Sequence, residues 1–404
     1  MKKFFTLLFV LSANLVLIQA QHIASGTCGA ADDNLTWSLD KNSDEQLVLT
    51  ISGEGDMSDY EDETEVPWSA YLSQIAIIQL NEGVTTIGNC AFFGTTSLQS
   101  ITMPSTLTSI GEYSLQKSGI AELIIPNSVN NYGRYAFSYC PNLKHCELSN
   151  QADLTYSLFS NDPLLESVLI PEGVEIIQEG AFVNCPALAE IALPNSLTDI
   201  EDYAFMNCSA LKEITIPENL TFIGRDICTG CPLEKVVWNA KNCPVLVDAG
   251  SACPPFLANR STITTFSFGD EVQVIPTYLC SSLARLLYVI IPEKVATIKD
   301  GAFWQCQGMV AIYNHAVSPQ QITASVLEGI SRSACKLYVP ESSIPSYGAA
   351  LVWKEFEVKV LPPNEGFEQI RANGNKAQKV LSDGQVFVTM PDGTLFNAGG
   401  QQVR

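Results

Sequence analysis

The sequence predicts a solenoid, an elongated fold in which successive turns of the chain stack on one another. A motif repeats every 23 residues in the middle of the chain, where Phe182 recurs at Phe205, and Cys185 recurs at Cys208 and Cys231. A fixed period of about 20 to 30 residues is typical of folds in which one unit cannot bury its apolar side chains without a neighbour. We call one such unit a rung, and we expect the rungs to stack around one long core.

The repeated rungs are expected to span residues 82–316. Successive rungs, aligned on the phenylalanine position of the motif, lie 22 or 23 residues apart at Phe92, Leu115, Phe137, Phe159, Phe182, Phe205 and Cys228, and again at Cys280 and Phe303. The pattern is degenerate over 239–268, where two irregular rungs are expected, with Phe266 in the strand of the second. Each regular rung contains a Leu-x-x-Ile-x-Ile segment, which predicts a short strand, and a proline that ends it. The predicted fold class is therefore an α/β-type solenoid, with a parallel sheet on one face, short helical or irregular turns opposite, and small β-rich caps.

The N-terminus combines a predicted targeting segment with a cap. Residues 1–20 join the basic Met1-Lys2-Lys3 to an apolar run and to Ala20, the pattern of a cleaved signal peptide. The apolar run is shorter than the roughly 20 residues of a membrane span, so an uncleaved anchor is the less favoured alternative, and the mature chain is expected to lack a transmembrane helix. Residues 21–81 contain two alternating segments, 34–39 and 46–52, which predict a hairpin in a β-rich cap.

The C-terminal residues leave the repeat period. Residues 317–361 are expected to cap the last rung, and residues 362–375, which begin Pro362-Pro363, to form a linker. Residues 376–404 predict a small β tail of three short strands, at 379–381, 385–389 and 394–397, with Asp-Gly turns between them. This tail is either a sorting or anchoring segment or a structural addition.

Composition narrows the function classes. The chain of 404 residues is 46% hydrophobic and 16% charged, which is typical of an ordered protein. Its formal net charge of −21 argues against nucleic acid or an anionic lipid surface as a partner. Catalytic motifs such as G-x-S-x-G and H-E-x-x-H are absent from the sequence, so we expect no enzyme, no cofactor and no metal site. In the acidic segment 56–65, a solvated loop is favoured over a calcium site because the carboxylate spacing does not fit an EF-hand.

The thirteen cysteines are interpreted as structural. Cys228 and Cys231 form a C-x-x-C motif, but they stand at the phenylalanine and cysteine positions of the repeat, so a redox or zinc role is not expected. Matched side chains on stacked strands lie about 4.8 Å apart, beyond the Cβ separation of about 3.5–4.5 Å in a disulfide. We expect free, inward-facing thiols along the column Cys140, Cys185, Cys208, Cys231 and Cys306. Cys243 and Cys253, in the irregular stretch, are the favoured pair for a disulfide.

The repeats also resemble a known family. The consensus Ile-Gly-x-x-Ala-Phe-x-x-Cys-x-x-Leu-x-x-Ile-x-Ile-Pro is similar to that of the BspA-like leucine-rich repeats of bacteria. The Gly26-Thr-Cys-Gly29 and Lys336-Leu-Tyr-Val-Pro340 segments resemble parts of that family's N-terminal and closing modules. The resemblance implies a leucine-rich repeat solenoid in a secreted or cell-surface protein of anaerobic bacteria that binds other proteins, some members being adhesins for host extracellular matrix. The expected location is extracellular or on the outer cell surface, with the periplasm as the alternative.

The candidate binding site is the outer face of the predicted sheet. In each Leu-x-x-Ile-x-Ile segment, the residues before and after the first Ile point away from the core and form two rows along the solenoid. One row is largely apolar and the other partly acidic, which suits a protein or peptide ligand better than a small molecule. The alternatives are an ordinary sheet surface, rows covered by the protein's own loops, a structural or assembly role in the envelope, polysaccharide binding and, least favoured, glycan hydrolysis. The rows comprise Ser100, Thr102, Glu122, Ile124, His145, Glu147, Ser167, Leu169, Glu190, Ala192, Glu213, Thr215, Lys235, Val237, Ile290 and Tyr313.

Overall fold

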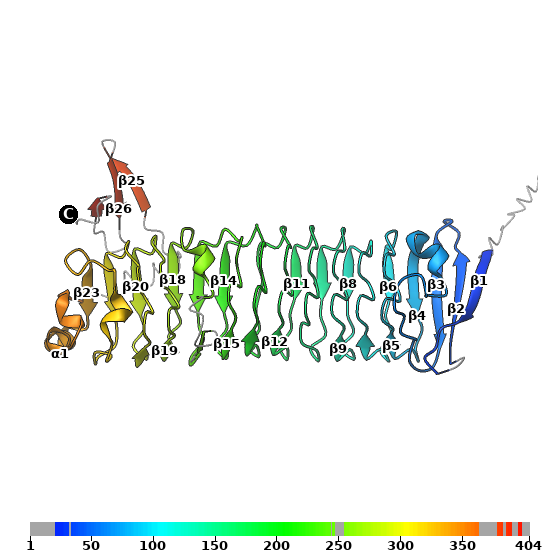
Figure 1. The fold of residues 1–404 in the computed structure, drawn as a ribbon, viewed down its shortest axis with the longest axis horizontal. Helices are drawn as coiled ribbons and strands as arrows, with labels where there is room; N and C mark the ends of the chain where they lie inside the picture. The colour runs from blue at the N-terminus through cyan, green and yellow to red at the C-terminus, as the bar shows by residue number, and fades with distance from the viewer. Residues whose placement is uncertain are drawn as a thin grey trace, which may run out of the picture.

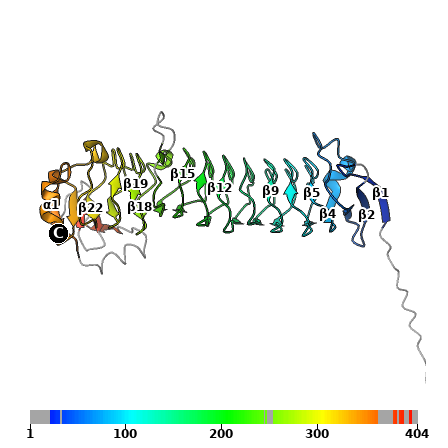
Figure 2. The same cartoon turned by 90° about the horizontal axis from the view of Figure 1, so that it is seen from below.

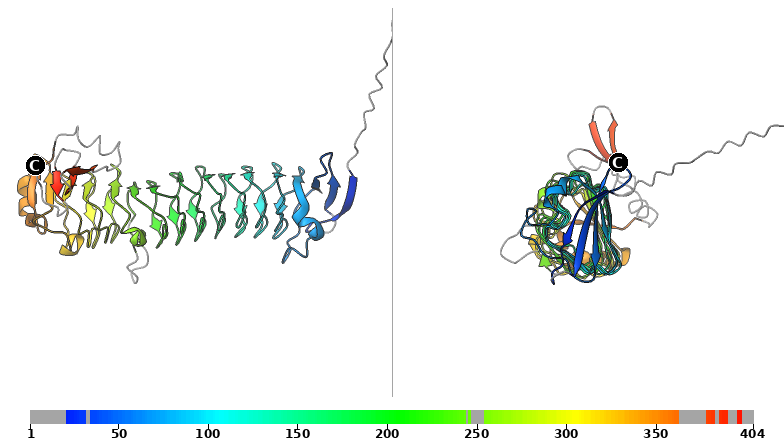
Figure 3. Two further views of the ribbon diagram at one scale, coloured as in Figure 1. Left: turned by 90° about the horizontal axis from the view of Figure 1, so that it is seen from above. Right: turned by 90° about the vertical axis from the view of Figure 1, so that its right-hand side faces the viewer.

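The computed structural model describes residues 21–31, 34–243, 245–246, 254–362, 378–382, 385–389 and 395–397, with the backbone alone at 245–246 and from 378 onward. These residues form a long rod of stacked rungs with a cap at each end (Figure 1, Figure 2). Seen along the rod, the rungs superpose, as a solenoid requires (Figure 3). Within these ranges, none of the helices has the length and apolar character needed to cross a membrane. The predicted signal peptide lies outside the described residues.

The N-terminal cap is a β-sheet that continues into the solenoid. The expected hairpin is confirmed, because β2 and β3 pair antiparallel, and β1 adds to the outer edge. β3 then pairs in parallel with β4, and β4 with β6. Trp68, at the start of the 3₁₀ helix η1 (Ser69–Gln74), is fully buried at this junction and donates its indole N–H to the Ala91 carbonyl at 2.9 Å. The strands of this sheet are β1 (Gln21–Thr27), β2 (Leu35–Lys41), β3 (Leu47–Gly53), β4 (Ile75–Leu80) and β6 (Ser100–Thr102).

One side of each rung carries the strand expected from the Leu-x-x-Ile-x-Ile segment. These first-column strands pair in parallel and in register, so that Leu123, Cys146 and Val168 align and point into the core. The parallel arrangement is confirmed, but the ladder is divided into several sheets; residues 190–192, for example, form no strand between β11 and β14. Beyond β6 the column contains β8 (Glu122–Ile124), β10 (His145–Glu147), β11 (Ser167–Leu169), β14 (Glu213–Ile216), β16 (Lys235–Trp238), β18 (Thr265–Phe268), β20 (Tyr288–Ile291) and β22 (Ala311–Asn314).

The opposite part of the rung contains turns with little helix, and it also contains short strands that the sequence did not predict. A second column of two-residue strands forms there, and neighbours such as β12 and β13 pair in parallel. The column consists of β5 (Thr86–Ile87), β7 (Ser109–Ile110), β9 (Asn131–Tyr132), β12 (Ile176–Ile177), β13 (Asp199–Ile200), β15 (Phe222–Ile223), β17 (Val245–Leu246), β19 (Val274–Ile275) and β21 (Thr297–Ile298).

The third side of the rung contains the phenylalanine position and is held by hydrogen bonds between rungs. The Phe182 amide, for example, donates to the Ala204 carbonyl at 2.8 Å. Here the backbone enters the left-handed region twice, two residues before and two residues after the phenylalanine position, as at Tyr203 (φ 58°) and Asn207 (φ 62°) around Phe205. The left-handed region costs most residues about 1–2 kcal/mol and is tolerated better by Gly and Asn. These two corners allow a rung to close without a helix.

The irregular stretch holds one enlarged rung instead of the two that the sequence predicts. β18 pairs directly with β16, so Lys235 lies opposite Thr265, 30 residues later. Within the same rung, β17 pairs with β15 and extends the second column. The prediction was wrong because it divided the interval into steps of about 23 residues, whereas one longer rung spans most of it. The expected strand around Phe266 is confirmed as β18.

Columns of matched side chains fill the core. The rings of Phe159, Phe182 and Phe205 are fully buried and stack with 5.5 Å between neighbouring centroids. The repeat cysteines point inward, and each donates its S–H to a carbonyl one rung earlier, as Cys208 does to Phe182 at 3.2 Å. Burial raises the pKa of the Cys185 thiol well above its usual value. The column cysteines are free thiols, as predicted.

The C-terminal cap closes the far end of the core. β23 (Lys336–Val339) and β24 (Glu357–Val360) extend the first column beyond β22, and Tyr347 and Trp353 are fully buried beneath them. The only α-helix in the described part of the chain is here. The helical elements of the cap are η3 (Ala324–Leu327), η4 (Glu341–Ser343), α1 (Ile344–Ala349) and η5 (Trp353–Glu355), while η2 (Leu257–Asn259) lies in the enlarged rung. The expected tail strands are confirmed as an antiparallel sheet of β25 (Gln378–Ser382), β26 (Gln385–Thr389) and β27 (Leu395–Asn397).

Candidate functional site

The predicted rows lie on the outer face of the first column. The twelve predicted residues from Ser100 to Thr215 are all exposed. Further along, Lys235, Val237 and Ile290 are half-buried, and Tyr313 is buried. The open part of the rows is therefore the half nearer the N-terminal cap.

Two apolar side chains dominate this open half. Ile124 is 70% exposed and Leu169 is 58% exposed, and both lie in register with Glu147 between them. The neighbouring row places Glu122, His145 and Ser167 side by side, with His145 Nδ1 2.7 Å from Ser167 Oγ. We call the exposed side chains of β8, β10 and β11 the Ile124–Leu169 face. It offers two apolar anchors beside carboxylates on strands fixed by backbone pairing.

The far end of the rows is covered by the chain itself. Tyr313 is only 3% exposed, because its ring stacks on Tyr338 with centroids 4.8 Å apart and meets the edge of Tyr288 at 6.2 Å. Leu361, just after β24, packs against the same cluster. The prediction that Tyr313 belongs to an exposed surface is therefore wrong. Large aromatic residues in neighbouring rungs turn the outer row into a second small core.

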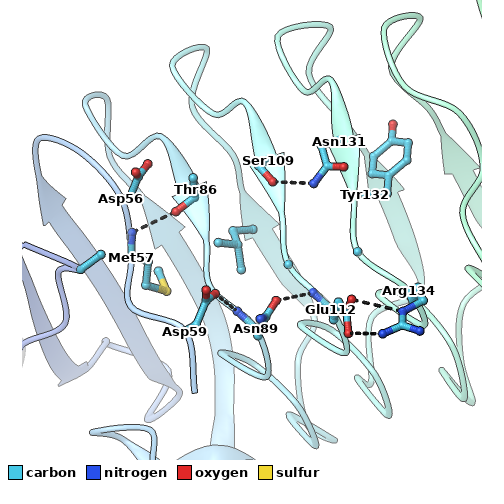
Figure 4. Close-up of a pocket in the computed structure, with 14 residues that line it drawn as sticks. Asp56, Met57, Asp59, Thr86, Asn89, Ser109, Glu112, Asn131, Tyr132 and Arg134 are labelled. Atoms are coloured by element: carbon cyan, nitrogen blue, oxygen red, sulfur yellow. Dashed lines mark hydrogen bonds and ion pairs between the residues drawn. The ribbon is translucent and has the colours of Figure 1, made fainter. Parts of the chain in front are cut away.

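A polar cavity of about 600 Å³ lies between the N-terminal cap and the second-column strands β5, β7 and β9 (Figure 4). Asp59 and Asn89 accept backbone N–H groups from successive rungs, at 2.8 and 2.7 Å. Glu112 then pairs with Arg134 at 3.2 Å. Each of these side chains bonds to the next rung along the solenoid, so the cavity is part of the contact between the N-terminal cap and the first rungs.

The acidic segment 56–65 takes part in this contact. Asp56 accepts a hydrogen bond from the Thr85 hydroxyl at 2.5 Å, and the Met57 amide donates to the Thr86 hydroxyl at 3.0 Å. The solvated-loop interpretation was therefore incomplete, because part of the segment docks on the first rungs. In the part of the chain that the structure describes, no three His, Cys, Asp or Glu side chains are grouped to hold a metal ion.

A buried acid stands at the repeat cysteine position of one rung. Asp162, three residues after Phe159, is fully buried, and its Oδ1 accepts the Cys140 amide at 2.7 Å. Its Oδ2 has no hydrogen-bond partner among the described residues. Burial raises the pKa of this carboxyl well above its usual value. Sequence reasoning missed Asp162, although alignment on the phenylalanine position places it in the cysteine column.

The C-x-x-C motif and Cys243 lie in the core, as the structural interpretation of the cysteines predicts. Cys228 is fully buried at the phenylalanine position, and Cys231 donates to the Phe205 carbonyl at 3.0 Å, as other column thiols do one rung apart. Cys243 lies 3.5 Å from the Thr221 carbonyl. Cys253 lies outside the described residues, so the disulfide between Cys243 and Cys253 stays a prediction.

The comparison of this chain with models of known protein families identifies a repeat family. A family model described as the BspA type leucine rich repeat region, in six copies, matches residues 70–189, 154–246 and 181–310. The curated proteins contain no match. Among solved structures, a leucine-rich repeat protein from Bacteroides ovatus is 20% identical, with 82% of this chain and 99% of that chain covered and a TM-score of 0.44. A leucine-rich cell surface protein from Faecalibacterium prausnitzii is 21% identical, with 89% and 99% covered and a TM-score of 0.39. The pneumococcal vaccine antigen PcpA is 16% identical, with 83% and 100% covered and a TM-score of 0.31.

Proposed function

Because the chain belongs to the BspA-type leucine-rich repeat family, we propose that it is an exported, non-catalytic repeat protein that binds another protein or a peptide, as an adhesin does. Export is supported by the signal-peptide pattern of residues 1–20. The proposed location is the outer cell surface, where proteins of the host extracellular matrix are the ligands within reach. The observation that carries the proposal is the Ile124–Leu169 face.

The chemistry of this face favours a protein ligand. Burying an exposed Ile or Leu side chain stabilises a complex by about 1.5–3 kcal/mol, and two anchors on paired strands lose little conformational freedom on binding. Glu122 and Glu147 lie beside the anchors, and the whole chain carries a net charge of −21. Such a surface attracts a partner that presents apolar side chains within a basic rim.

The test is capture by the purified mature protein from a solubilised host-matrix extract and, in parallel, from a bacterial envelope extract. Replacing both Ile124 and Leu169 by Glu removes the anchors and should lower affinity for the captured protein by roughly 100-fold or more. Leu351→Glu is the matched control, because Leu351 is 70% exposed but lies on the C-terminal cap. All variants should keep the wild-type thermal melt.

Two outcomes would contradict the proposal. Equal capture by the double variant and the wild type would remove the Ile124–Leu169 face as the binding surface. Capture from the envelope extract alone, lost in the double variant, would favour an assembly role in the envelope over adhesion.

A further inference from the structure

A second cavity, of about 320 Å³, opens on the third side of the solenoid and is lined by tyrosines. Tyr135 and Tyr156 line one end and Tyr203 lines the other, while Gly180 and Ser157 lie between them along the chain. We call this cavity the tyrosine slot. It lies on a different side of the rung from the Ile124–Leu169 face and shares none of its residues.

The slot arises where one column of the repeat is interrupted. The left-handed corner two residues before the phenylalanine position carries tyrosine in several rungs, including Tyr135 (φ 59°) and Tyr203 (φ 58°). Between them, the same corner is occupied by Ser157 (φ 53°) and Gly180 (φ 65°). Two consecutive rungs therefore lack a large side chain at this position, and the space between the tyrosines is left as a cavity.

At both ends of the slot, further side chains pack against the tyrosines that line it. The Tyr113 ring stacks on Tyr135 with centroids 5.2 Å apart, and Tyr135 in turn meets Tyr156 edge to face at 5.4 Å. At the other end, the Arg225 guanidinium lies over Tyr203, 5.8 Å from its centroid, and is itself held by an ion pair with Asp202 at 2.6 Å. Because these rings are already held in place in the free protein, they lose little conformational freedom when a ligand binds, which lowers the entropic cost of binding.

The size of the slot suits a small ligand. Its volume of about 320 Å³ lies at the lower end of the range of about 300–1,000 Å³ that is typical of ligand pockets. Tyr135 and Tyr203 stand at the same corner three rungs apart, and the two corners between them carry Ser157 and Gly180 instead of a ring. A tyrosine at either end can therefore pack against the ring of a ligand.

The polar groups of the slot suit a hydroxylated ring, and we propose that the slot binds one sugar residue of a neutral glycan. Glu179 is the one ionisable acid in the lining, which contains no Lys, Arg or His, so an anionic ligand would be repelled. The Asn207–Asn184–Asn161 chain of amide hydrogen bonds, each 2.8 Å, ends with the NH₂ group of Asn161 at the slot.

A proline-rich peptide is the alternative ligand for an aromatic groove. Proline residues carry no N–H donor, so they offer the exposed Glu179 carboxylate no hydrogen bond of their own. Sugar hydroxyls both donate and accept, and they can satisfy Glu179, Asn161 and the tyrosine hydroxyls together. The lining therefore favours the glycan.

The test uses saturation-transfer NMR on the purified mature protein with the methyl glycosides of glucose, galactose, mannose and N-acetylglucosamine, and with decaproline. Gly180→Tyr fills the slot with the residue that the next rung carries at the same corner, Tyr203 (φ 58°), so the backbone conformation suits it. The added Cβ would lie 3.1 Å from Val183 Cγ2, which has to shift by a few tenths of an ångström. Tyr203→Asn removes one wall and keeps a residue that tolerates the left-handed region. Tyr278→Asn is the matched control, because Tyr278 (φ 56°) occupies the same corner outside the slot.

At least one glycoside is expected to bind in the millimolar range, with affinity lowered roughly tenfold or more by Gly180→Tyr and Tyr203→Asn and unchanged by Tyr278→Asn. Circular dichroism establishes that each variant is folded, and either of the two slot variants is sufficient for the test. Binding of decaproline without any glycoside would overturn the proposal. So would the absence of a signal from all four glycosides, or equal glycoside binding by a folded slot variant and the wild type.

Discussion

Replacing Asp162 by Asn should stabilise the solenoid, and increasingly so as the pH rises. Asp162 is fully buried, and burial raises its pKa, so the carboxyl stays protonated in the folded chain at pH values where it ionises in the unfolded chain. A raised folded-state pKa contributes stability that is fully present below the unfolded value of about 3.9 and is lost as the pH rises towards the folded value. Asn keeps an oxygen for the Cys140 amide, which Asp162 accepts at 2.7 Å, and does not ionise.

The pH dependence of the difference in the free energy of unfolding is set by the binding of one proton. Between the unfolded and folded pKa values, the folded wild type holds one proton more than the unfolded chain, so its free energy of unfolding falls by about 1.4 kcal/mol per pH unit relative to Asp162→Asn. The other carboxylates are common to both proteins, and their contributions cancel in the difference. The slope ends where the folded carboxyl itself ionises.

Urea unfolding followed by tryptophan fluorescence measures this difference. Titration from pH 5 to 8 keeps the protein above its isoelectric point of about 4.4. Asp162→Cys, which restores the repeat residue, should show the same pH-dependent gain over the wild type, because a buried thiol is also neutral in this range. A stability difference that does not change with pH in either variant would refute the assignment of Asp162 as a neutral buried acid.

Three further predictions concern the columns. Phe182→Ala should lower the free energy of unfolding by about 3–5 kcal/mol, because the ring is fully buried between Phe159 and Phe205; a loss below about 1 kcal/mol in urea unfolding would contradict the ladder. Asn184 (φ 59°) sits at a left-handed corner, so Asn184→Ala should be about 1 kcal/mol less stable than Asn184→Gly, and equal urea midpoints would count against that strain. Thiol titration of the unfolded, unreduced protein should find Cys185 and Cys208 reduced, and the same thiols should react slowly in the native protein because they are buried.

The parts of the fold that could be predicted are those whose sequence motif is long enough to show a periodic pattern. The Leu-x-x-Ile-x-Ile segment predicted the first-column strands, and the register of Cys231 predicted an inward, structural thiol. The second column could not be predicted, because a two-residue strand such as β12 has too few residues to show an alternating pattern. The enlarged rung was missed because counting by a constant period cannot detect one longer turn.

The candidate sites were less accessible to sequence reasoning. Outward rows could be read from alternation, and this placed Ile124 and Leu169 correctly on the surface. Alternation could not show that Tyr313 is covered, because burial there depends on Tyr338 and on Leu361 from the following segments. The tyrosine slot depends on Ser157 and Gly180 standing in adjacent rungs. A reading of each rung by itself cannot detect such a cavity.

In this solenoid, the two proposed sites lie where the residue type changes along an outer column. The inner columns keep buried and mostly apolar side chains, because each side chain must pack against matched neighbours one rung away. The outer columns are free of that requirement, and large apolar residues in one of them make the Ile124–Leu169 face while small residues in another make the tyrosine slot. Since the two sites project from different sides of the rung and share no residue, their variants should act independently: Leu169→Glu should leave glycoside binding unchanged, and Gly180→Tyr should leave protein capture unchanged. Loss of both activities in either folded variant would show that they share one surface.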